Sequence, residues 1–322
     1  MALIGTDILK AAAILKQNAL VAIPTETVYG LAGNALNADA VTKIFETKNR
    51  PSFDPLIVHI HQIDEVTKYT PQFHPTLAKL AEAFWPGPLT VLVPRREIIP
   101  DLVCSGLPQV ALRVPAHPLT LALLKSIDFP LAAPSANPFG YISPTMPQHV
   151  AAQLGDKIDY ILDGGPCRVG IESSIVGMED DELCMYRLGG ISKEEIEQVA
   201  GQQVLIKSQV QEKVLAPGQL SSHYAPDKKM ILGDIAYWLA NTDPKEVGIL
   251  SFSKIYDEVE ESRQIQLSVK EDLREAAQNL FAALRILDNM PVTTILAEPL
   301  PDIGLGRAIN DRLKRAAVGK AD

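Results

Sequence analysis

The sequence predicts an α/β protein of two domains, with a mixed sheet in the first domain and a small parallel sheet in the second. The chain has 322 residues, about twice the length of a typical single domain. Hydrophobic residues make up 47% of it and charged residues 21%, a composition typical of folded proteins with a substantial core. Short apolar runs alternate with helical patterns along the chain, and this interleaving favours the α/β class.

Apolar runs that end at glycine, proline or polar residues predict the strands of the first domain, residues 1–200. Strands and helices do not alternate strictly in this part, so we expect a mixed sheet rather than a purely parallel one. The predicted strands are residues 20–23, 56–60, 90–93, 110–114, 131–133, 160–162, 174–176 and 184–186.

Start signals predict helices in the same domain, over residues 39–47, 76–84 and 192–200. The last has Ser192 at its start and Glu195 three positions later, which is the pattern of a capping box. The first residues, MALIGTDILKAAAILKQ, carry a charge every few positions and no basic leader. They predict an amphipathic helix rather than a secretion signal, so we expect a cytoplasmic protein. No apolar run is long enough to cross a membrane.

A polar stretch, residues 201–228, separates the two domains and predicts a linker. Its SSHY sequence is unusual for a spacer, and loops often carry function. In the second domain, residues 229–322, apolar runs again alternate with helical patterns, which predicts a small parallel sheet. Its predicted strands are residues 230–232, 248–252 and 293–297, and its predicted helices are residues 272–289 and 306–317.

Charge and cysteine content exclude several classes of protein. The formal charge of −9 argues against a protein that coats nucleic acid, although it allows a local basic cleft. The three cysteines form no CxxC pair, so we expect free thiols and no metal site. There is no GxxxxGK[ST], GxSxG or HExxH motif, and GLG at 304–306 lacks the third glycine of a dinucleotide site.

Two polar segments that adjoin strands of the first domain are candidates for ligand binding. Thr25, Glu26 and Thr27 directly follow a strand, where α/β proteins often bind ligands, although the two threonines could instead cap a turn. Lys48 and Arg50 follow a helix, and they could hold a triphosphate or satisfy the last carbonyls of that helix.

Two histidines follow in the next strand. His59 and His61 are two positions apart and would share a face of that strand. A metal site would need a third ligand, which we do not find, so we favour a histidine that contacts substrate.

A third candidate is Arg113, which lies inside an apolar strand. Such a charge is costly unless it is paired, so it predicts either a buried salt bridge or a clamp on a carboxylate or phosphate. Ser135 and Asn137 stand at the end of another strand, and Ser173 and Arg187 extend the same theme later in the chain. Together these residues predict a cleft for an anionic ligand, of which nucleotide phosphates are the commonest case.

Taken together and in order, these segments resemble the YrdC-like threonylcarbamoyl-AMP synthase family. The motifs are PTETVYGL, KNRP…PLIVH, WPGPLT, VALRVPAHP, APSAN…SPT, ESS and YRLGG. The resemblance covers about residues 7–200 and implies a twisted mixed-sheet α/β fold for them. The rest resembles the long form of the family, in which a linker with an SxxHYAP-type motif joins a small Rossmann-like domain.

The resemblance implies that L-threonine, bicarbonate and ATP, the last with magnesium, react to give threonylcarbamoyl-AMP and pyrophosphate. A separate transferase complex then moves the threonylcarbamoyl group to the adenosine beside the anticodon of certain tRNAs. Catalysis would rest on Lys48 and Arg50, by electrostatic stabilisation and alignment. No organic cofactor, resident metal or membrane is implied, and a weak direct contact with tRNA is left open.

Motif by motif, the resemblance also implies two groups of binding residues. The residues that would contact ATP are Lys48, Arg50, Asp54, Gln109, Ser135, Asn137, Ser143, Arg187 and His223. The residues that would contact L-threonine are Thr27, His59, Arg113, Ala133 and Ser173.

Two of these positions depart from the family pattern or vary within it. Asp54 stands where the family commonly has asparagine, and a carboxylate there would repel a triphosphate unless magnesium intervenes. Gln109 matches a variable position. We also expect His223 and Tyr224 to fold over the cleft as a lid that excludes water.

Two other functions remain as alternatives. A relative that makes carbamoyl-AMP from carbamoyl phosphate would contain this domain among zinc-finger segments, and the absence of CxxC pairs argues against it. An RNA-binding module could use the same fold. The acidic charge and the lack of interleaved basic and aromatic residues argue against that function.

Overall fold

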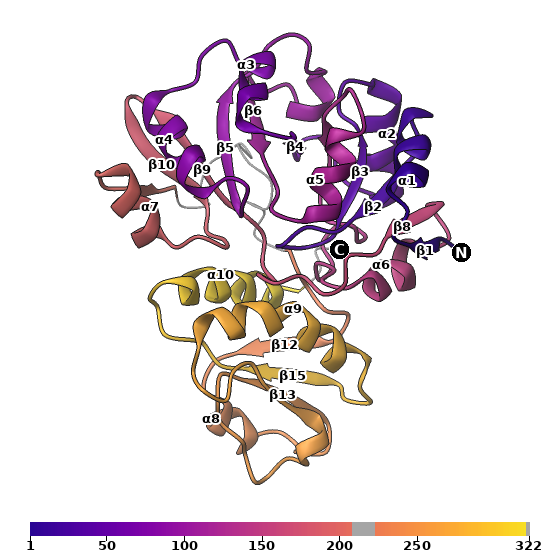
Figure 1. Ribbon diagram of the computed structural model, residues 1–322. Coiled ribbons are helices and arrows are strands. Elements are labelled where there is room, and N and C mark those ends of the chain that lie inside the picture. The colour runs from indigo at the N-terminus through magenta and orange to yellow at the C-terminus, as the bar shows by residue number, and fades with distance from the viewer. Residues whose placement is uncertain (208–222, 320–322) are drawn as a thin grey trace.

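A computed structural model describes residues 1–207 and 223–319, which form two sheets in two domains (Figure 1). The first domain contains an 11-stranded sheet with the order β1-β8-β2-β3-β7-β4-β6-β5-β9-β10-β11. Its strands are β1 (Leu3–Gly5), β2 (Val21–Ile23), β3 (Gly30–Asn34), β4 (Ile57–His59), β5 (Leu89–Pro94), β6 (Gln109–Arg113), β7 (Leu131–Ala132), β8 (Tyr160–Leu162), β9 (Ser174–Glu179), β10 (Glu182–Arg187) and β11 (Leu205–Ile206).

Parallel and antiparallel pairs are combined in this sheet, as the irregular alternation of strands and helices predicted. β4 pairs with β6 in parallel and with β7 in antiparallel fashion, and β5 is antiparallel to β6 but parallel to β9. The helices of this domain are α1 (Ile8–Lys16), α2 (Ala38–Lys48), α3 (Val66–Tyr69), α4 (Pro75–Phe84), α5 (Pro118–Lys125), α6 (Pro147–Leu154) and α7 (Lys193–Ala200).

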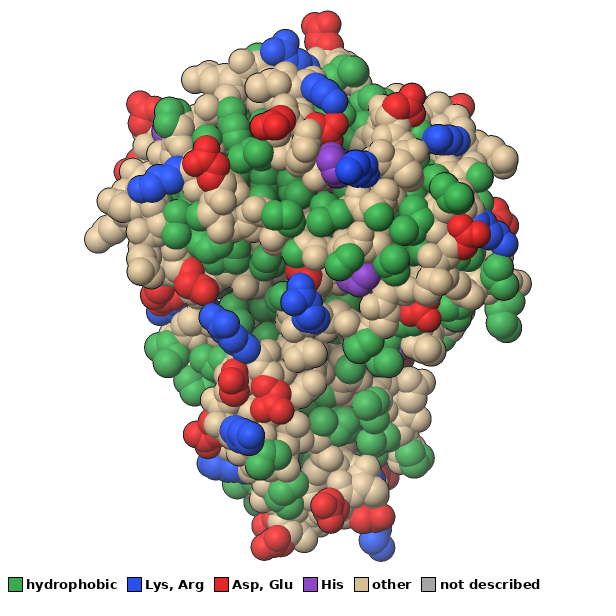
Figure 2. Space-filling view, in the orientation of Figure 1, with side chains coloured by type: hydrophobic (Ala, Val, Ile, Leu, Met, Phe, Trp, Pro, Cys, Tyr) green, Lys and Arg blue, Asp and Glu red, His purple; other side chains and the backbone are tan. Residues whose placement is uncertain are grey.

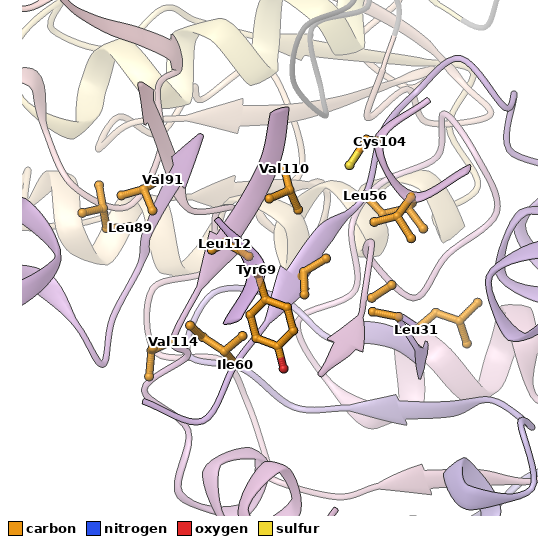
Figure 3. Close-up of a cluster of buried hydrophobic side chains, with 14 of the residues drawn as sticks. Leu31, Leu56, Ile60, Tyr69, Leu89, Val91, Cys104, Val110, Leu112 and Val114 are labelled. Carbon is orange, nitrogen blue, oxygen red and sulfur yellow. The ribbon is translucent and has the colours of Figure 1, made fainter. Parts of the chain in front are cut away.

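The main core lies between this sheet and its helices. Leu89, Val91 and Leu112 lie on strands β5 and β6, and they are fully buried in the same cluster as Tyr69 (Figure 3). Alternate residues of β5 point into this cluster, because successive side chains of a strand point to opposite faces of the sheet. The three cysteines are free and buried, as expected.

Four parallel strands form the sheet of the second domain, in the order β12-β15-β13-β14. They are β12 (Lys229–Leu232), β13 (Val247–Ser251), β14 (Gln264–Gln266) and β15 (Thr294–Ala297), and the helices are α8 (Ile235–Leu239), α9 (Leu273–Asn289) and α10 (Leu305–Ala317). α9 and α10 lie between this sheet and the first domain, whereas α8 lies on the far side (Figure 1). The α/β fold with one mixed and one parallel sheet is therefore confirmed.

Local signals were the most accurate guide to the elements. Ser192 and Glu195 form the predicted capping box at α7. The prediction of a helix from the first residue onward was wrong in part, because the first residues form β1, which pairs in parallel with β8. Strand β3, GLAGN, was missed because its glycines read as a turn. Strand β14 and helices α5, α6 and α8 were also missed.

The two domains share buried surface. One apolar cluster combines Val28 and Tyr141 of the first domain with Phe281 and Leu284 of α9. Gly170 shows how close the contact is, because a Cβ atom at this position would lie 2.4 Å from the Cα atom of Gln278 in α9. Among the described residues, no helix is long and apolar enough to cross a membrane.

Candidate active site

A cleft in the first domain collects most of the predicted site residues. It lies where the loop after β2 meets the ends of β4, β6 and β7, and residues 172–173 and 223–224 complete its wall. The predicted residues that line it are Thr27, Arg50, His59, Arg113, Ala133, Ser135, Ser173, Arg187 and His223. Residues from seven separate segments thus meet in one cavity.

The loop after β2 serves both as a capped turn and as part of the cleft. The Thr25 hydroxyl accepts the backbone N–H groups of Thr27 and Val28 at 3.1 Å each and donates to the Val28 carbonyl at 2.6 Å. The Thr27 hydroxyl lies 2.8 Å from that of Thr25 and also lines the cleft. The capped turn is therefore confirmed for Thr25, which presents Thr27 to the cleft, and ligand binding by this segment stays a prediction.

Arg113 forms the buried salt bridge that its position in a strand predicted. Its Nη2 lies 2.6 Å from Oε1 of Glu26, and its Nε donates to the Gly87 carbonyl at 3.2 Å. The other oxygen of Glu26 accepts the Ala116 N–H at 2.9 Å. Both side chains are almost fully buried, and Arg113 still lines the cleft. The carboxylate fixes the guanidinium where it can meet a ligand.

His59 lies next to Arg113 because strands β4 and β6 are in register at these two residues. Burial, together with the nearby guanidinium, lowers the pKa of His59 to about 3. Its imidazole is therefore neutral at physiological pH. His61 lies outside the cleft, and its backbone N–H bonds to Glu65, so the two histidines do not form a pair.

Lys48 supports the cleft from behind instead of lining it. It ends α2, and its ammonium donates to the carbonyls of Ser135 and Asn137 at 2.6 and 2.5 Å. Burial and the charge of Arg50 hold its pKa well below the usual value. As placed here, Lys48 fixes the loop that presents Ser135 and does not line the cleft, and its direct contact with ATP stays a prediction.

Arg50 reaches the cleft with its donors fixed by the following loop. Its Nε donates to the Asp54 carbonyl at 3.1 Å, and its Nη2 donates to the Pro55 carbonyl at 2.9 Å. Nη2 also lies 2.9 Å from a carboxylate oxygen of Asp54. This geometry does not support the predicted contact of Asp54 with ATP, because Asp54 does not line the cleft. Asp54 is fully buried behind Arg50 and serves as its counter-ion.

Three further predicted ATP contacts do not line the cleft. Asn137 donates to the carbonyls of Pro138 and Tyr141, and Ser143 donates to Glu172 at 2.7 Å, so both hold the walls from within. Gln109 was misplaced. It lies at the opposite end of β6 from Arg113, in a separate groove, because a strand carries residues four positions apart to different ends of the sheet.

Arg187 and Ser173 form one unit on the wall. Arg187 donates from Nε to the Ser173 carbonyl and from Nη2 to the Ser173 hydroxyl, both at 2.9 Å. The Ser173 hydroxyl also lies 2.7 Å from that of Thr90. Burial lowers the pKa of Arg187 to about 10, which still leaves it charged at neutral pH.

His223 and Tyr224 close one side of the cleft. The His223 ring packs edge-on against Phe139 and Tyr224, with ring centres 5.8 and 4.1 Å apart. Burial and the charges of Arg50 and Lys48 hold the pKa of His223 well below its usual value, so this ring is neutral. The rest of the predicted lid, residues 208–222, lies outside the described residues, and the lid stays a prediction.

The cleft offers no carboxylate that is free to hold a metal ion. Glu26 and Asp54 are paired with Arg113 and Arg50, and Glu172 bonds to Ser143 and Arg312. No group of three metal-binding side chains occurs in the described ranges 1–207 and 223–319. That ATP brings its own magnesium stays a prediction.

Family models match both domains. The Sua5–YciO–YrdC family, described as telomere recombination, matches residues 13–189. The C-terminal domain of threonylcarbamoyl-AMP synthase matches residues 191–318. This chain belongs to the threonylcarbamoyl-AMP synthase family. The alternative of a carbamoyl-AMP-forming relative does not explain the second match.

Relatives of similar length support this assignment. The threonylcarbamoyl-AMP synthase of Bacillus subtilis is 41% identical over 98% of this chain and 94% of its own length. That of Pyrococcus abyssi is 39% identical over 95% and 93%. The crystal structure of P. abyssi Sua5 in complex with L-threonine superposes with a TM-score of 0.91 at 35% identity, over 99% of this chain and 98% of that one.

The sequence did not reveal three residues that organise the site. Glu172 was visible as part of the ESS motif, but its partners come from distant segments. Glu26 was visible as a carboxylate after a strand, without any signal that Arg113 is its partner. Arg312 gave no signal at all, because it lies 140 residues from Glu172.

Proposed function

We propose that this chain is an L-threonylcarbamoyladenylate synthase that converts L-threonine, bicarbonate and ATP into threonylcarbamoyl-AMP, pyrophosphate and water. One observation carries the proposal. A single cleft presents Arg50 and Arg187, suited to phosphates, beside Thr27, His59 and Arg113, suited to a small polar amino acid. The likeness to a structure that contains L-threonine supports the same conclusion.

In the first step of the proposed reaction, the amine of threonine loses a proton and attacks the carbon of bicarbonate. Water leaves, and a carbamate forms. Arg113 would hold the threonine carboxylate, because a guanidinium can bind both carboxylate oxygens. Neutral His59 adds no positive charge against the amine, so the cleft does not repel a cationic substrate at this point.

In the second step, a carbamate oxygen attacks the α-phosphorus of ATP and pyrophosphate leaves. Negative charge then grows on the phosphate oxygens and on the leaving group. Arg50 and Arg187, whose positions are fixed by Asp54 and Ser173, would stabilise that charge. ATP would bring its magnesium. No protein nucleophile is needed, since substrate groups carry out both attacks.

The product would be used by a tRNA-modifying transferase complex, so a cytoplasmic location would suit the enzyme. Direct binding of RNA is the weaker part of this proposal. On the face shown in Figure 2, Lys and Arg side chains are interspersed with Asp and Glu among the described residues and do not form one basic patch. We expect at most a weak contact with tRNA.

Pyrophosphate release by the purified protein tests the proposal. It is measured with MgATP while threonine and bicarbonate are left out in turn. Release that requires both supports the synthase. Release with carbamoyl phosphate instead would favour the carbamoyl-AMP-forming alternative, and no release under any condition would leave a binding module.

A further inference from the structure

An arginine from the second domain reaches the wall of the cleft. Arg312 lies on α10 and is 0% exposed. It has the largest side chain among the fully buried residues that the structure describes. Its Nε lies 3.1 Å from Oε2 of Glu172, and its Nη1 donates to the Leu188 carbonyl at 2.5 Å. Its guanidinium also lies over the ring of Tyr224, 5.6 Å from the ring centre.

Each of these three contacts is with a segment that forms the cleft. Glu172 and Tyr224 line it, and Leu188 directly follows Arg187. Arg312 therefore joins the segment that carries Ser173 to the segment that carries Arg187. These two residues bond to each other across the same wall.

Glu172 transmits the contact further. Its other carboxylate oxygen accepts the Ser143 hydroxyl at 2.7 Å, and its backbone carbonyl accepts the Gly190 N–H at 2.9 Å. The peptide groups around Glu172 and Ser173 pack tightly on the next loop, since a Cβ atom at Gly189 would lie 2.4 Å from the Glu172 carbonyl oxygen. A shift of Glu172 would therefore move Ser173 as well.

Docking of the two domains does not by itself account for Arg312. An apolar cluster already joins them, and more exposed ion pairs, Arg307 with Glu194 and Arg274 with Glu195, lie elsewhere in the interface. Burying a guanidinium has a desolvation cost, and apolar contacts can hold two domains together without that cost. Arg312 also bonds to Asp311 and Ala308 of its own helix, but its three contacts outside α10 all converge on the wall of the cleft.

We propose that Arg312 is a positioning residue for the synthase reaction, through which the second domain sets the placement of Ser173 and Arg187. This inference rests on the proposed function. It gives the second domain a role in the reaction, although that domain contributes no side chain to the lining of the cleft. The contact also links substrate binding to the docking of the two domains. If docking raises the affinity for substrates by some factor, bound substrates stabilise the docked arrangement by the same factor.

The test compares two arginines of the same helix in the full chain. Arg312→Met removes the contact with the cleft wall, and Arg307→Met removes an interdomain ion pair that does not reach the cleft. We expect Arg312→Met to raise the KM for threonine or ATP by about tenfold or more, as the loss of a charged hydrogen bond does. Arg307→Met should stay within about twofold of the wild type.

KM separates positioning from mere stability. A purely structural role would lower the melting temperature and the fraction of active enzyme, so kcat would fall while KM stayed unchanged. If Arg312→Met leaves both KM values at those of Arg307→Met, the proposal is overturned. A wild-type chain that releases no pyrophosphate would instead contradict the proposed function.

Two further variants keep the test decisive if Arg312→Met does not fold. Glu172→Gln retains the size of the partner and removes its charge, and it should raise KM in the same direction. Arg312→Lys retains the charge but lacks the planar guanidinium that reaches Glu172 from Nε and Leu188 from Nη1, so it should give only partial rescue. Folded variants with wild-type KM values would count against the proposal.

A double-mutant cycle then measures the contact itself. If Arg312 acts through Glu172, the double variant Glu172→Gln, Arg312→Met should lose little more in kcat/KM than the worse single variant. Losses that simply multiply would show that the two residues act independently, which would also overturn the proposal.

Discussion

The two sides of the cleft differ in how their buried charges are balanced. On one side, Lys48 and Arg50 share a single carboxylate, Asp54. On the other, Arg113 is paired with Glu26, and neighbouring His59 is neutral. The first side thus has two basic side chains for one carboxylate, and a polyanion such as ATP would favour the charged forms of both. The second is balanced, which suits an amino acid that carries both charges. The comparison supports the proposed placement of ATP on the first side and of threonine on the second.

Replacement of Arg50 should impair ATP binding on the first side and have the largest effect of the changes considered. Arg50→Ala removes a guanidinium that lines the cleft and leaves Asp54 buried without its partner. We expect kcat/KM for ATP to fall more than about 100-fold, since both the contact and its support disappear. Pyrophosphate release over an ATP titration measures this. Arg50→Gln with Asp54→Asn, which removes both charges, is the control for folding.

Replacement of Arg113 should weaken threonine binding on the second side and leave ATP binding on the first side nearly unchanged. We expect Arg113→Ala to raise the KM for threonine by about 10- to 100-fold, the range for one charged hydrogen-bond partner. The KM for ATP should change much less. Titrations of both substrates decide the matter, with Arg113→Gln, Glu26→Gln as the charge-free control. Equal and mild effects of Arg50→Ala and Arg113→Ala would contradict the division into two sides.

The dependence of the free energy of unfolding on pH tests whether His59 is neutral in the folded protein. Its pKa in the folded state is about 3, below the roughly 6.5 of an unfolded histidine, so below pH 6.5 the unfolded chain binds the proton more readily. Its contribution to stability is therefore complete above pH 6.5 and is lost as the pH falls toward 3. Chemical unfolding at pH 7, 6 and 5 measures the slope.

His59→Gln should flatten that slope by up to about 1.4 kcal/mol per pH unit. An unchanged slope in the variant would mean that His59 titrates normally in the folded protein. The second side of the cleft would then gain a charge near pH 6 and lose its balance.

The smallest effect is expected for Asp54→Asn. Since Asp54 lies behind Arg50 and not in the cleft, the KM for ATP should stay within about threefold of the wild type or fall slightly. A steep rise in KM would show instead that this carboxylate contacts the nucleotide or its magnesium. The same ATP titration serves as the measurement.

Contacts between neighbours in the chain could be predicted, and contacts between distant segments could not. The capping box of Ser192 and Glu195 follows from three positions of sequence, and the structure has it. The motifs also identified most residues of the cleft, since each adjoins the end of a strand. Which atoms pair could not be predicted, because Glu26 meets Arg113 only after β4, β6 and the loop after β2 have come together.

The same limit explains why some predicted ATP contacts do not line the cleft. Lys48 and Asp54 have the residue types of nucleotide contacts, yet both are buried behind the wall, and only the packing of α2 against the following loops decides this. Gln109 and Arg113 belong to one short strand, but the strand spans the distance between two grooves. Residue type thus indicates the chemistry of a site, while three-dimensional packing decides which side chain performs it.

The apolar cluster shared by the two domains has a consequence for how the protein melts. Tyr224 stacks on Phe281 with ring centres 5.4 Å apart, and Val28 and Tyr141 are buried in the same cluster. Neither sheet can lose its partner without exposing these side chains to water. We therefore expect calorimetry to record one cooperative heat-absorption peak rather than two, and the isolated first domain to be prone to aggregation.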